Sequence, residues 1–288
     1  MSSRISDVRR QFNRNANSYD AHAHIQRLMS DRLAQSFLGL KSKSNFSGLN
    51  ILEIGCGTGN LTETLVTEWP SASITALDIA PAMIKLAEQR VLSAETNFNS
   101  IRKKSSDSLR FLHADVETWA PDAKAASFDL IVSNACFQWL SNPGQTLGHL
   151  RRMLRPGGSL TFTTFGPDTF CEMHEAFNEV YRANGMEPQR HGLRFLSTDE
   201  WSSLLKEAGF SSIQFERSIQ TETYASARDF LHSVKAMGAS TSEAITVSGL
   251  SSRSLFTSMY KEYEAKFSIP EGVAASYDIL LFQALAEE

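Results

Sequence analysis

The 288-residue chain has no long apolar run and few cysteines, and both absences narrow what it can be. No stretch approaches the roughly 20 apolar residues that cross a bilayer, and the N-terminus lacks the apolar segment of an export signal. The three cysteines (Cys56, Cys136 and Cys171) are isolated, without the paired spacing of a zinc site or a disulfide framework. We therefore expect a cytoplasmic protein that does not engage a membrane.

Charge and motif content argue against several further functions. The 28 basic and 32 acidic residues give a net charge of −4, so nucleic acid is not an expected partner. The sequence has no Gly-x-Ser-x-Gly elbow, no Gly-Lys-Ser/Thr end of a P-loop and no His-Glu-x-x-His zinc motif. His22 and His24 lie close together but would face different sides of a helix. We therefore expect no metal site.

The most informative stretch is residues 51–60, Ile-Leu-Glu-Ile-Gly-Cys-Gly-Thr-Gly-Asn. An apolar run typical of a buried strand leads into a three-glycine turn, and a helical pattern follows from Leu61. Glycines in such a turn permit positive φ and let a ligand approach the backbone closely. A loop between a strand end and a helix N-terminus is a natural ligand site in an open α/β sheet.

The turn differs from a dinucleotide-binding fingerprint in two respects. Only Thr58 separates Gly57 from Gly59, whereas that fingerprint has two residues between its second and third glycines. Glu53, just before the turn, would repel a pyrophosphate, whereas it suits a cationic ligand with an amino group. The string resembles motif I of the class I methyltransferases, which implies S-adenosylmethionine as the methyl donor and S-adenosylhomocysteine as the product. An NAD-dependent dehydrogenase with a degenerate glycine turn is the alternative.

Two acids close later strands at positions suited to a nucleoside. Asp78 follows Gly59 by 19 residues, where an acid can accept both ribose hydroxyls, although it could instead cap the helix that Pro81 begins. Asp115 can accept from the adenine amino group, although a plain strand-end aspartate is the alternative. The resemblance to the methyltransferases favours the contact between Asp115 and adenine. The complete set expected to bind the cofactor is Glu53, Gly55, Cys56, Gly57, Gly59, Asp78, Ile79, Met83, Asp115, Val116, Asn134 and Phe137. Met83 and Phe137 are equally well explained as core residues.

Alternating strand and helix patterns predict a mostly parallel, Rossmann-like α/β sheet with an antiparallel last strand. We expect strands at 50–54, 73–78, 109–115, 128–134, 159–165, 213–219 and 277–285. Helices are expected at 61–68, from 81, and at 143–154, 167–184, 197–208, 225–237 and 253–267, with two more within 6–40. We expect an N-terminal helical lid (1–45) and a methyltransferase domain (46–288) with cap insertions at about 166–196 and 238–268. Residues 93–108, rich in Ser, Asn and Lys, suggest a flexible insertion.

Segments outside the glycine turn narrow the resemblance. They are Phe12-x-Arg14-x-Ala16-x-x-Tyr19-Asp20, Asn134-x-x-Phe137-Gln138-Trp139, Arg194-Phe195-Leu196 and Ser233-Val234-Lys235. Together they resemble the malonyl-acyl carrier protein O-methyltransferases of biotin synthesis over nearly the whole chain. The resemblance implies methyl transfer to the free carboxylate of malonyl-acyl carrier protein or malonyl-CoA, giving the methyl ester that primes pimeloyl synthesis.

That reaction needs no general base, because the malonyl carboxylate is already ionised at neutral pH. By analogy with the family, Tyr19 and Arg194 are expected to position the carboxylate, and Lys235 and Arg14 are the next candidates for this role. A packing role for Tyr19 and a surface ion pair for Arg194 are the alternatives. Basic residues at 102–104, or Arg151, Arg152 and Arg155, could meet an acidic carrier protein. We expect a monomer. The rival functions are methylation of a free, aconitate-like acid and a non-catalytic S-adenosylmethionine-binding module.

Overall fold

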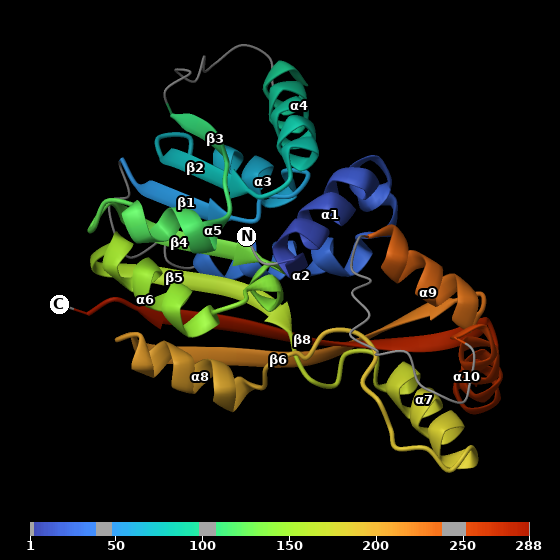
Figure 1. Cartoon of the computed structure of the whole chain (residues 1–288). Coiled ribbons are helices and arrows are strands. Elements are labelled where there is room, and N and C mark those ends of the chain that lie inside the picture. Colours follow the sequence, from blue (N-terminus) through green and yellow to red (C-terminus); the bar gives the residue numbers. More distant parts are fainter. Residues whose placement is uncertain (1–2, 39–47, 98–107, 238–251, 288) are drawn as a thin grey trace.

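The computed structural model describes residues 3–38, 48–97, 108–237 and 252–287 (Figure 1). These residues form one mixed sheet with helices on both faces. Within the described residues, no helix is long and apolar enough to cross a membrane.

The sheet follows the strand order β3-β2-β1-β4-β5-β8-β6, with β7 paired to the end of β8. Strands β1 to β5 run parallel to one another, and β8 runs antiparallel to both β5 and β6. The predicted mostly parallel sheet with an antiparallel last strand is therefore confirmed. The strand bounds are β1 Asn50–Ile54, β2 Ser73–Asp78, β3 Leu109–His113, β4 Phe128–Asn134, β5 Leu154–Phe165, β6 Ser211–Tyr224, β7 Ser268–Ile269 and β8 Gly272–Leu285.

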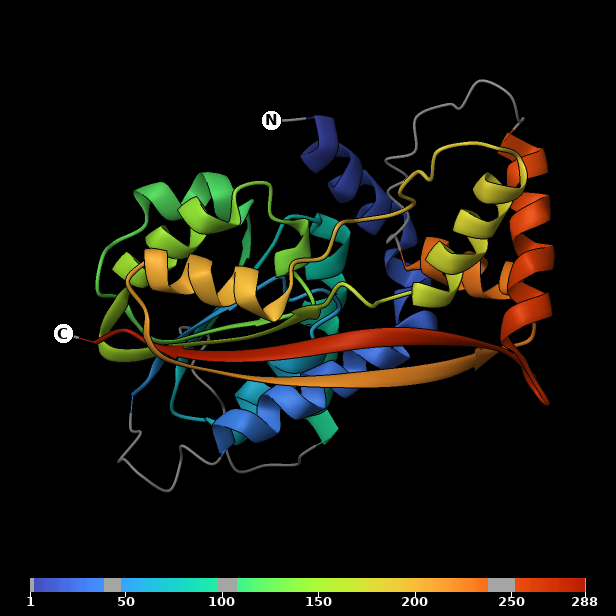
Figure 2. The same cartoon turned by 90° about the horizontal axis from the view of Figure 1, so that it is seen from below.

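Helices cover both faces of the sheet, with α2 on one side and α6 and α8 on the other (Figure 2). The helix bounds are α1 Ser3–His22, α2 His24–Leu38, α3 Asn60–Glu68, α4 Pro81–Asn97, α5 Val116–Trp119, α6 Pro143–Met153, α7 Cys171–Ala183, α8 Thr198–Glu207, α9 Ala227–Ala236 and α10 Ser252–Phe267. The 3-10 turns η2 and η3 span Ala120–Asp122 and Phe137–Trp139.

Strands β8 and β6 extend well beyond the end of β5, which pairs with β8. The β5–β8 pairing ends at Phe165 opposite Ile279, whereas β6 follows β8 as far as Tyr224 opposite Val273. Helices α7, α9 and α10 gather at this extended end (Figure 2). Their buried residues form a core with the end of β8 that includes Phe177, Phe230, Tyr263 and Tyr277. The extended strands thus support a helical lobe beside the carboxyl ends of the parallel strands.

Several element boundaries differ from the sequence-based expectations. The third strand ends at His113 because Asp115 caps α5, its Oδ1 accepting from the Glu117 amide. Residues 93–97, expected in a flexible insertion, continue helix α4. The fifth strand begins at Leu154, five residues early, with a register irregularity opposite β4.

Other expectations are met or remain open. The helix expected at 197–208 is present as α8, which begins with a Ser197–Glu200 capping box in which both reciprocal hydrogen bonds are formed. Helix α7 begins at Cys171, after a turn over 167–170. Residues 238–251 of the expected cap insertion and the basic run at 102–104 lie outside the described residues. The division into a lid, a domain and cap insertions stays a prediction.

Glu53 carries a carboxyl group into the interior of the sheet. Its side chain is only 1 % exposed on the central strand β1, and the Thr62 hydroxyl donates to Oε2 at 2.6 Å. Burial raises the pKa of Glu53 to about 8, because the ionised form loses its hydration. The folded chain therefore keeps a proton on Glu53 at pH values where the unfolded chain has released it.

We expect Glu53→Gln to remove a pH dependence of stability. The contribution of the retained proton is fully present below the ordinary pKa of 4.5 and is lost as the pH rises through about 8. The glutamine mimics the protonated acid, so wild type should lose stability relative to the variant by at least about 1 kcal/mol over that interval. Urea unfolding of both proteins across the interval measures the difference. Glu88→Gln, at an exposed position, is the control. If the free energy of unfolding changed with pH in the same way for Glu53→Gln and wild type, the raised pKa of Glu53 would be contradicted.

Candidate functional site

The glycine turn between β1 and α3 is held by backbone geometry that side chains would disturb. Gly55 and Gly59 have φ values of 74° and 86°, in the left-handed region. A Cβ on Gly55 would lie 2.6 Å from Cys136 Sγ, and one on Gly59 would lie 2.8 Å from the Ala87 Cα. These positions therefore admit only glycine, because Cys136, which follows β4, and Ala87 of α4 approach the turn closely.

Asp78 ties this turn to the end of β2. Its Oδ2 accepts from the Gly57 amide at 2.8 Å and its Oδ1 from the Ala80 amide at 2.8 Å. Burial raises the pKa of the Asp78 carboxyl, while the two amide donors oppose that rise. Asp78 thus holds the glycine turn and the residue before α4 rather than capping that helix, and it also lines a cavity at the carboxyl ends of the strands.

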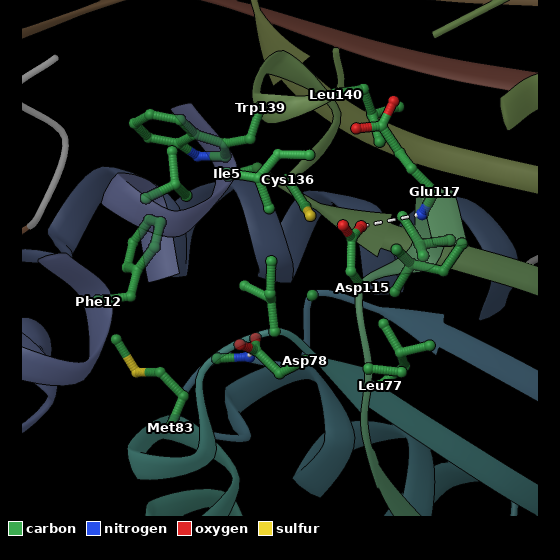
Figure 3. A pocket seen from close by; sticks show the side chains of 18 of the residues that line it. Ile5, Phe12, Leu77, Asp78, Met83, Asp115, Glu117, Cys136, Trp139 and Leu140 are labelled. Atoms are coloured by element: carbon green, nitrogen blue, oxygen red, sulfur yellow. Dashed lines mark hydrogen bonds between the residues drawn. The ribbon is translucent and has the colours of Figure 1, made fainter. Parts of the chain in front are cut away.

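That cavity has a volume of about 100 Å³. Phe12 and Met83 lie on one side of it, and Asp115 and Leu77 on the opposite side (Figure 3). Eight of the predicted cofactor residues line it, namely Gly55, Gly57, Asp78, Ile79, Met83, Asp115, Val116 and Asn134. The glycine turn and the ends of β2, β3 and β4 therefore meet at one site, as expected for a parallel sheet.

Asp115 offers an acceptor to this small cavity. Its Oδ1 accepts from the Glu117 amide at 3.0 Å, whereas its Oδ2 is buried and has no hydrogen-bond partner among the described residues. Burial also raises the pKa of Asp115. A buried oxygen without a partner is costly, so a donor on a bound ligand would satisfy it. An exocyclic amino group of a nucleobase is such a donor.

Helix α1 is attached directly to the glycine turn. Thr58 Oγ1 donates to Asp20 Oδ1 at 2.6 Å, and Arg90 on α4 pairs with Asp20 Oδ2 at 2.5 Å. Arg90 Nε also donates to the Thr58 carbonyl at 2.9 Å. Nearer the other end of α1, Asn13 Oδ1 accepts from the Ala82 amide at 2.9 Å. These bonds place Phe12 and Tyr19, which lie on α1, over the cavity.

A second, larger cavity of about 600 Å³ lies between α1 and the helical lobe. Its lining is largely apolar, with side chains from α7, α9 and α10 and from β8. Phe12, Tyr19, Ala135 and Trp139 line both cavities. Phe12 and Trp139 meet edge to face with ring centroids 5.5 Å apart. The two cavities therefore adjoin along this mainly aromatic wall.

Tyr19 is the predicted substrate residue that lies at this junction. Burial raises the pKa of its hydroxyl above the usual value, and the nearby carboxylates of Asp78 and Asp20 add to the rise. The hydroxyl is consequently neutral at physiological pH and can donate a hydrogen bond. Lys235 lines the large cavity from α9, with an exposed side chain at its rim.

Two other predicted substrate residues lie outside both cavities. Arg194 is exposed and its guanidinium pairs with Glu200, the capping-box residue of α8. Its neighbours Leu193 and Phe195 line the large cavity, so the intervening side chain of this extended segment points away from it. Arg14 is exposed on α1. The surface ion pair that was the alternative for Arg194 is therefore what the structure contains.

Four predicted cofactor residues also lie outside the small cavity. Glu53 and Cys56 are buried behind the turn, and Gly59 packs on α4. Phe137 is 1 % exposed, with its ring centroid 4.6 Å from that of Phe162 and 6.2 Å from that of Trp201. Its core explanation thus agrees with the packing. The 3-10 turn η3 points Phe137 into the core and its neighbour Trp139 toward the cavities.

Several lining residues were not singled out by the sequence. Cys136 lines the small cavity, and burial raises the pKa of its thiol to about 12. His191 lines the large cavity, stacked on Phe177 at 3.6 Å and hydrogen-bonded to Tyr181. Burial lowers the pKa of His191 to about 4, which keeps the ring neutral. Arg228 and His232 also line this cavity from α9, and their helical spacing from Lys235 was the available signal.

Among the described residues, no group of three or more His, Cys, Asp or Glu side chains could hold a metal ion. The arrangement that does exist is a small cavity suited to a nucleoside beside a large apolar cavity. Such a pair can hold two molecules in contact at Tyr19, which is the geometry required for direct group transfer between them.

Comparison with known proteins agrees with this fold and site. A family model described as a methyltransferase domain matches residues 21–214. A SAM-dependent methyltransferase structure from Thermotoga maritima aligns with a TM-score of 0.52 at 17 % identity, covering 97 % of this chain and all of that one. A phosphoethanolamine N-methyltransferase from Haemonchus contortus, solved with S-adenosylhomocysteine, has a TM-score of 0.52 at 17 % identity, covering 88 % of this chain and 52 % of that one. At this identity these likenesses concern the fold.

Curated relatives are much more similar in sequence. A malonyl-[acyl-carrier protein] O-methyltransferase from Paenibacillus sp. (strain JDR-2) is 58 % identical, covering 96 % of this chain and 97 % of that protein. The protein of the same name from Brevibacillus brevis is 38 % identical, covering 96 % and 94 %. The chain therefore belongs to the malonyl-[acyl-carrier protein] O-methyltransferase family of S-adenosylmethionine-dependent methyltransferases.

Proposed function

We propose that this chain methylates the free carboxylate of a malonyl group carried as a thioester on acyl carrier protein, with malonyl-CoA as the alternative carrier. The product would be the malonyl methyl ester that primes pimeloyl synthesis for biotin. The observation that carries the proposal is the junction at Tyr19, where a small site lined by Asp78, Asp115 and the glycine turn adjoins a large apolar cavity. The family relationship supplies the identity of the acceptor.

The residues of the small cavity fit S-adenosylmethionine. We assign the buried, unpartnered Asp115 Oδ2 to the adenine amino group and Asp78 to the ribose hydroxyls. When bound, the cofactor supplies a methyl group on a positively charged sulfur. The two aspartates that line the cavity, Asp78 and Asp115, make this end of the sheet favourable for a cation. Met83 and Phe12 supply apolar contacts on the opposite side.

The acceptor carboxylate needs orientation rather than deprotonation. It is already ionised at neutral pH, so the residues around it must direct one oxygen toward the methyl carbon. Tyr19 is suited to this task because burial keeps its hydroxyl protonated and able to donate. A neutral donor holds the carboxylate without neutralising its charge. The proposed role of Arg194 gains no support from its ion pair with Glu200. Arg14 is exposed and lines neither cavity, and Lys235 is exposed and lines only the large one.

The apolar character of the large cavity also bears on the product. Methylation removes the charge of the carboxylate, and the resulting ester is compatible with surroundings such as Phe165, Phe170 and Met173. Water exclusion by these side chains would strengthen the single hydrogen bond from Tyr19. The lining thus favours a thioester acceptor over a small free dicarboxylic acid, which would remain fully polar at its other end.

Incubation of the enzyme with S-adenosylmethionine and malonyl-acyl carrier protein should add one methyl group, detected by mass spectrometry of the carrier protein. Malonyl-CoA and free dicarboxylic acids, including aconitate, are tested in parallel. Methylation of free acids alone would refute the thioester assignment. Tight cofactor binding without transfer to any acceptor would identify a non-catalytic binding module.

Tyr19→Phe should lower kcat/KM for the malonyl thioester by at least about tenfold, because a hydrogen bond to a charged group is lost. The affinity for S-adenosylhomocysteine should change by less than about threefold, since the carboxylate and not the cofactor is the proposed partner. Steady-state kinetics and calorimetric titration give the two quantities. An equal loss in both would show that Tyr19 acts through the cofactor site or through folding.

Asp115→Asn should weaken S-adenosylhomocysteine binding by about tenfold, because the acceptor aimed at adenine is replaced in part by an amide donor. Asparagine is also a good helix N-cap, so α5 should remain intact. Calorimetric titration measures the affinity, with exposed Asp122→Asn on η2 as the matched control. Unchanged affinity in Asp115→Asn would remove the assignment of Asp115 to the nucleobase.

A further inference from the structure

Helix α9 presents a basic stripe at the rim of the large cavity. Arg228, His232 and Lys235 are spaced i, i+4 and i+7, which puts them on one side of the helix. All three side chains are exposed and all three line the cavity. The same residues therefore face both solvent and the entrance. We call Arg228, His232 and Lys235 the α9 stripe.

The charges of the α9 stripe are not neutralised by the acids near it. The Asp229 carboxylate accepts from the Ser226 hydroxyl, and the Asp229 amide donates to the oxygen of Ser226, which caps the start of α9. Glu222 is bonded to His24 and to the Tyr224 hydroxyl. Among the described residues, neither Arg228 nor Lys235 forms an ion pair. Arg228 lies over the Tyr260 ring, 5.7 Å from its centroid, a contact that leaves the full positive charge in place.

Helix α1 continues this positive surface. Ser18 on α1 donates to the Ala236 carbonyl at the end of α9, at 3.5 Å. Arg14 precedes Ser18 by one turn on the same side of α1 and is exposed. Arg10, one turn further on, is paired with Asp7. Arg14 thus extends the positive surface of the α9 stripe onto the adjoining turn of α1.

A basic cluster that the sequence also offered for docking consists of Arg151, Arg152 and Arg155. Its side chains form hydrogen bonds and an ion pair within the protein. Arg151 donates to the carbonyls of Gly209 and Glu287, and Arg152 to those of Ala120, Pro121 and Ala123. Arg155 pairs with Asp129 through both carboxylate oxygens. The cluster also lies where β5 begins, at the edge of the sheet opposite the cavities. Arg155 is therefore neutralised by a carboxylate, whereas Arg151 and Arg152 keep their charge but line neither cavity.

We infer that the α9 stripe is the docking surface for an acidic carrier protein, and that the thioester arm enters the large cavity beside it; this inference rests on the proposed function. Charge complementarity identifies the partner, because the rim is positive while the chain as a whole carries −4. A flexible arm anchored on the docked protein reaches Tyr19 through the apolar lining. The surface recognises the protein that carries the substrate, and the interior recognises the acyl group.

The test uses Arg228→Glu with Lys235→Glu in the full-length chain. Reversing two rim charges should lower kcat/KM for malonyl-acyl carrier protein by at least about tenfold, mainly through KM. Turnover of malonyl-pantetheine, which carries the arm without protein or phosphate, should fall by less than about threefold because no charge complementarity is lost. Added salt should slow the wild-type reaction with the carrier protein more strongly than that of the variant.

The control makes the same charge change elsewhere, with Lys124→Glu and Lys206→Glu. Both side chains are exposed and line neither cavity, and α8, which bears Lys206, lies far from α9 (Figure 2). Equal losses in the two double variants would reduce the effect to net charge and overturn the inference. The inference would also be overturned if the Arg228→Glu, Lys235→Glu variant had the wild-type kcat/KM for malonyl-acyl carrier protein. An equal loss of activity with malonyl-acyl carrier protein and malonyl-pantetheine would overturn it as well. Absence of wild-type turnover with every malonyl thioester would instead refute the proposed function.

Discussion

The attachment of α1 to the glycine turn is the interaction on which the site depends. Asp20 joins Thr58 of the turn to Arg90 of α4 at 2.6 and 2.5 Å. Because Phe12 and Tyr19 lie on the same continuous helix as Asp20, this tie also determines where they lie. Those two rings form part of the wall between the cavities. A helix that precedes the sheet in sequence thereby becomes a component of both halves of the site.

The extension of β6 and β8 beyond β5 supports the other half of the site, the large cavity. Packing of α7, α9 and α10 on the extended strands creates a core separate from that of the parallel sheet. The large cavity lies between this lobe and α1. Its interior is apolar while its rim carries Arg228, His232 and Lys235. The apolar lining and the charged rim are thus separated by depth along one entrance.

Local patterns predicted the elements of the nucleoside site well, because those patterns depend on neighbours in sequence. Strand β2 has the expected bounds, and Asp78 closes it beside the glycine turn. Side-chain direction was harder to predict. Phe137 and Trp139 lie two residues apart in one motif, yet one packs in the core and the other lines both cavities. A short 3-10 turn decides between them, and no periodicity in the sequence reveals its orientation.

The sequence by itself determined the mostly parallel sheet, the glycine turn and the acids that follow it, since strand periodicity and positive φ are local requirements. Family resemblance over nearly the whole chain indicated the acceptor. Only the tertiary structure decided which basic residues are available. Arg194 is engaged by Glu200 and Arg155 by Asp129, whereas Arg228 and Lys235 remain at the cavity rim. Ion pairing joins residues brought together by folding, so charge in the sequence does not show which cations are left to meet a partner.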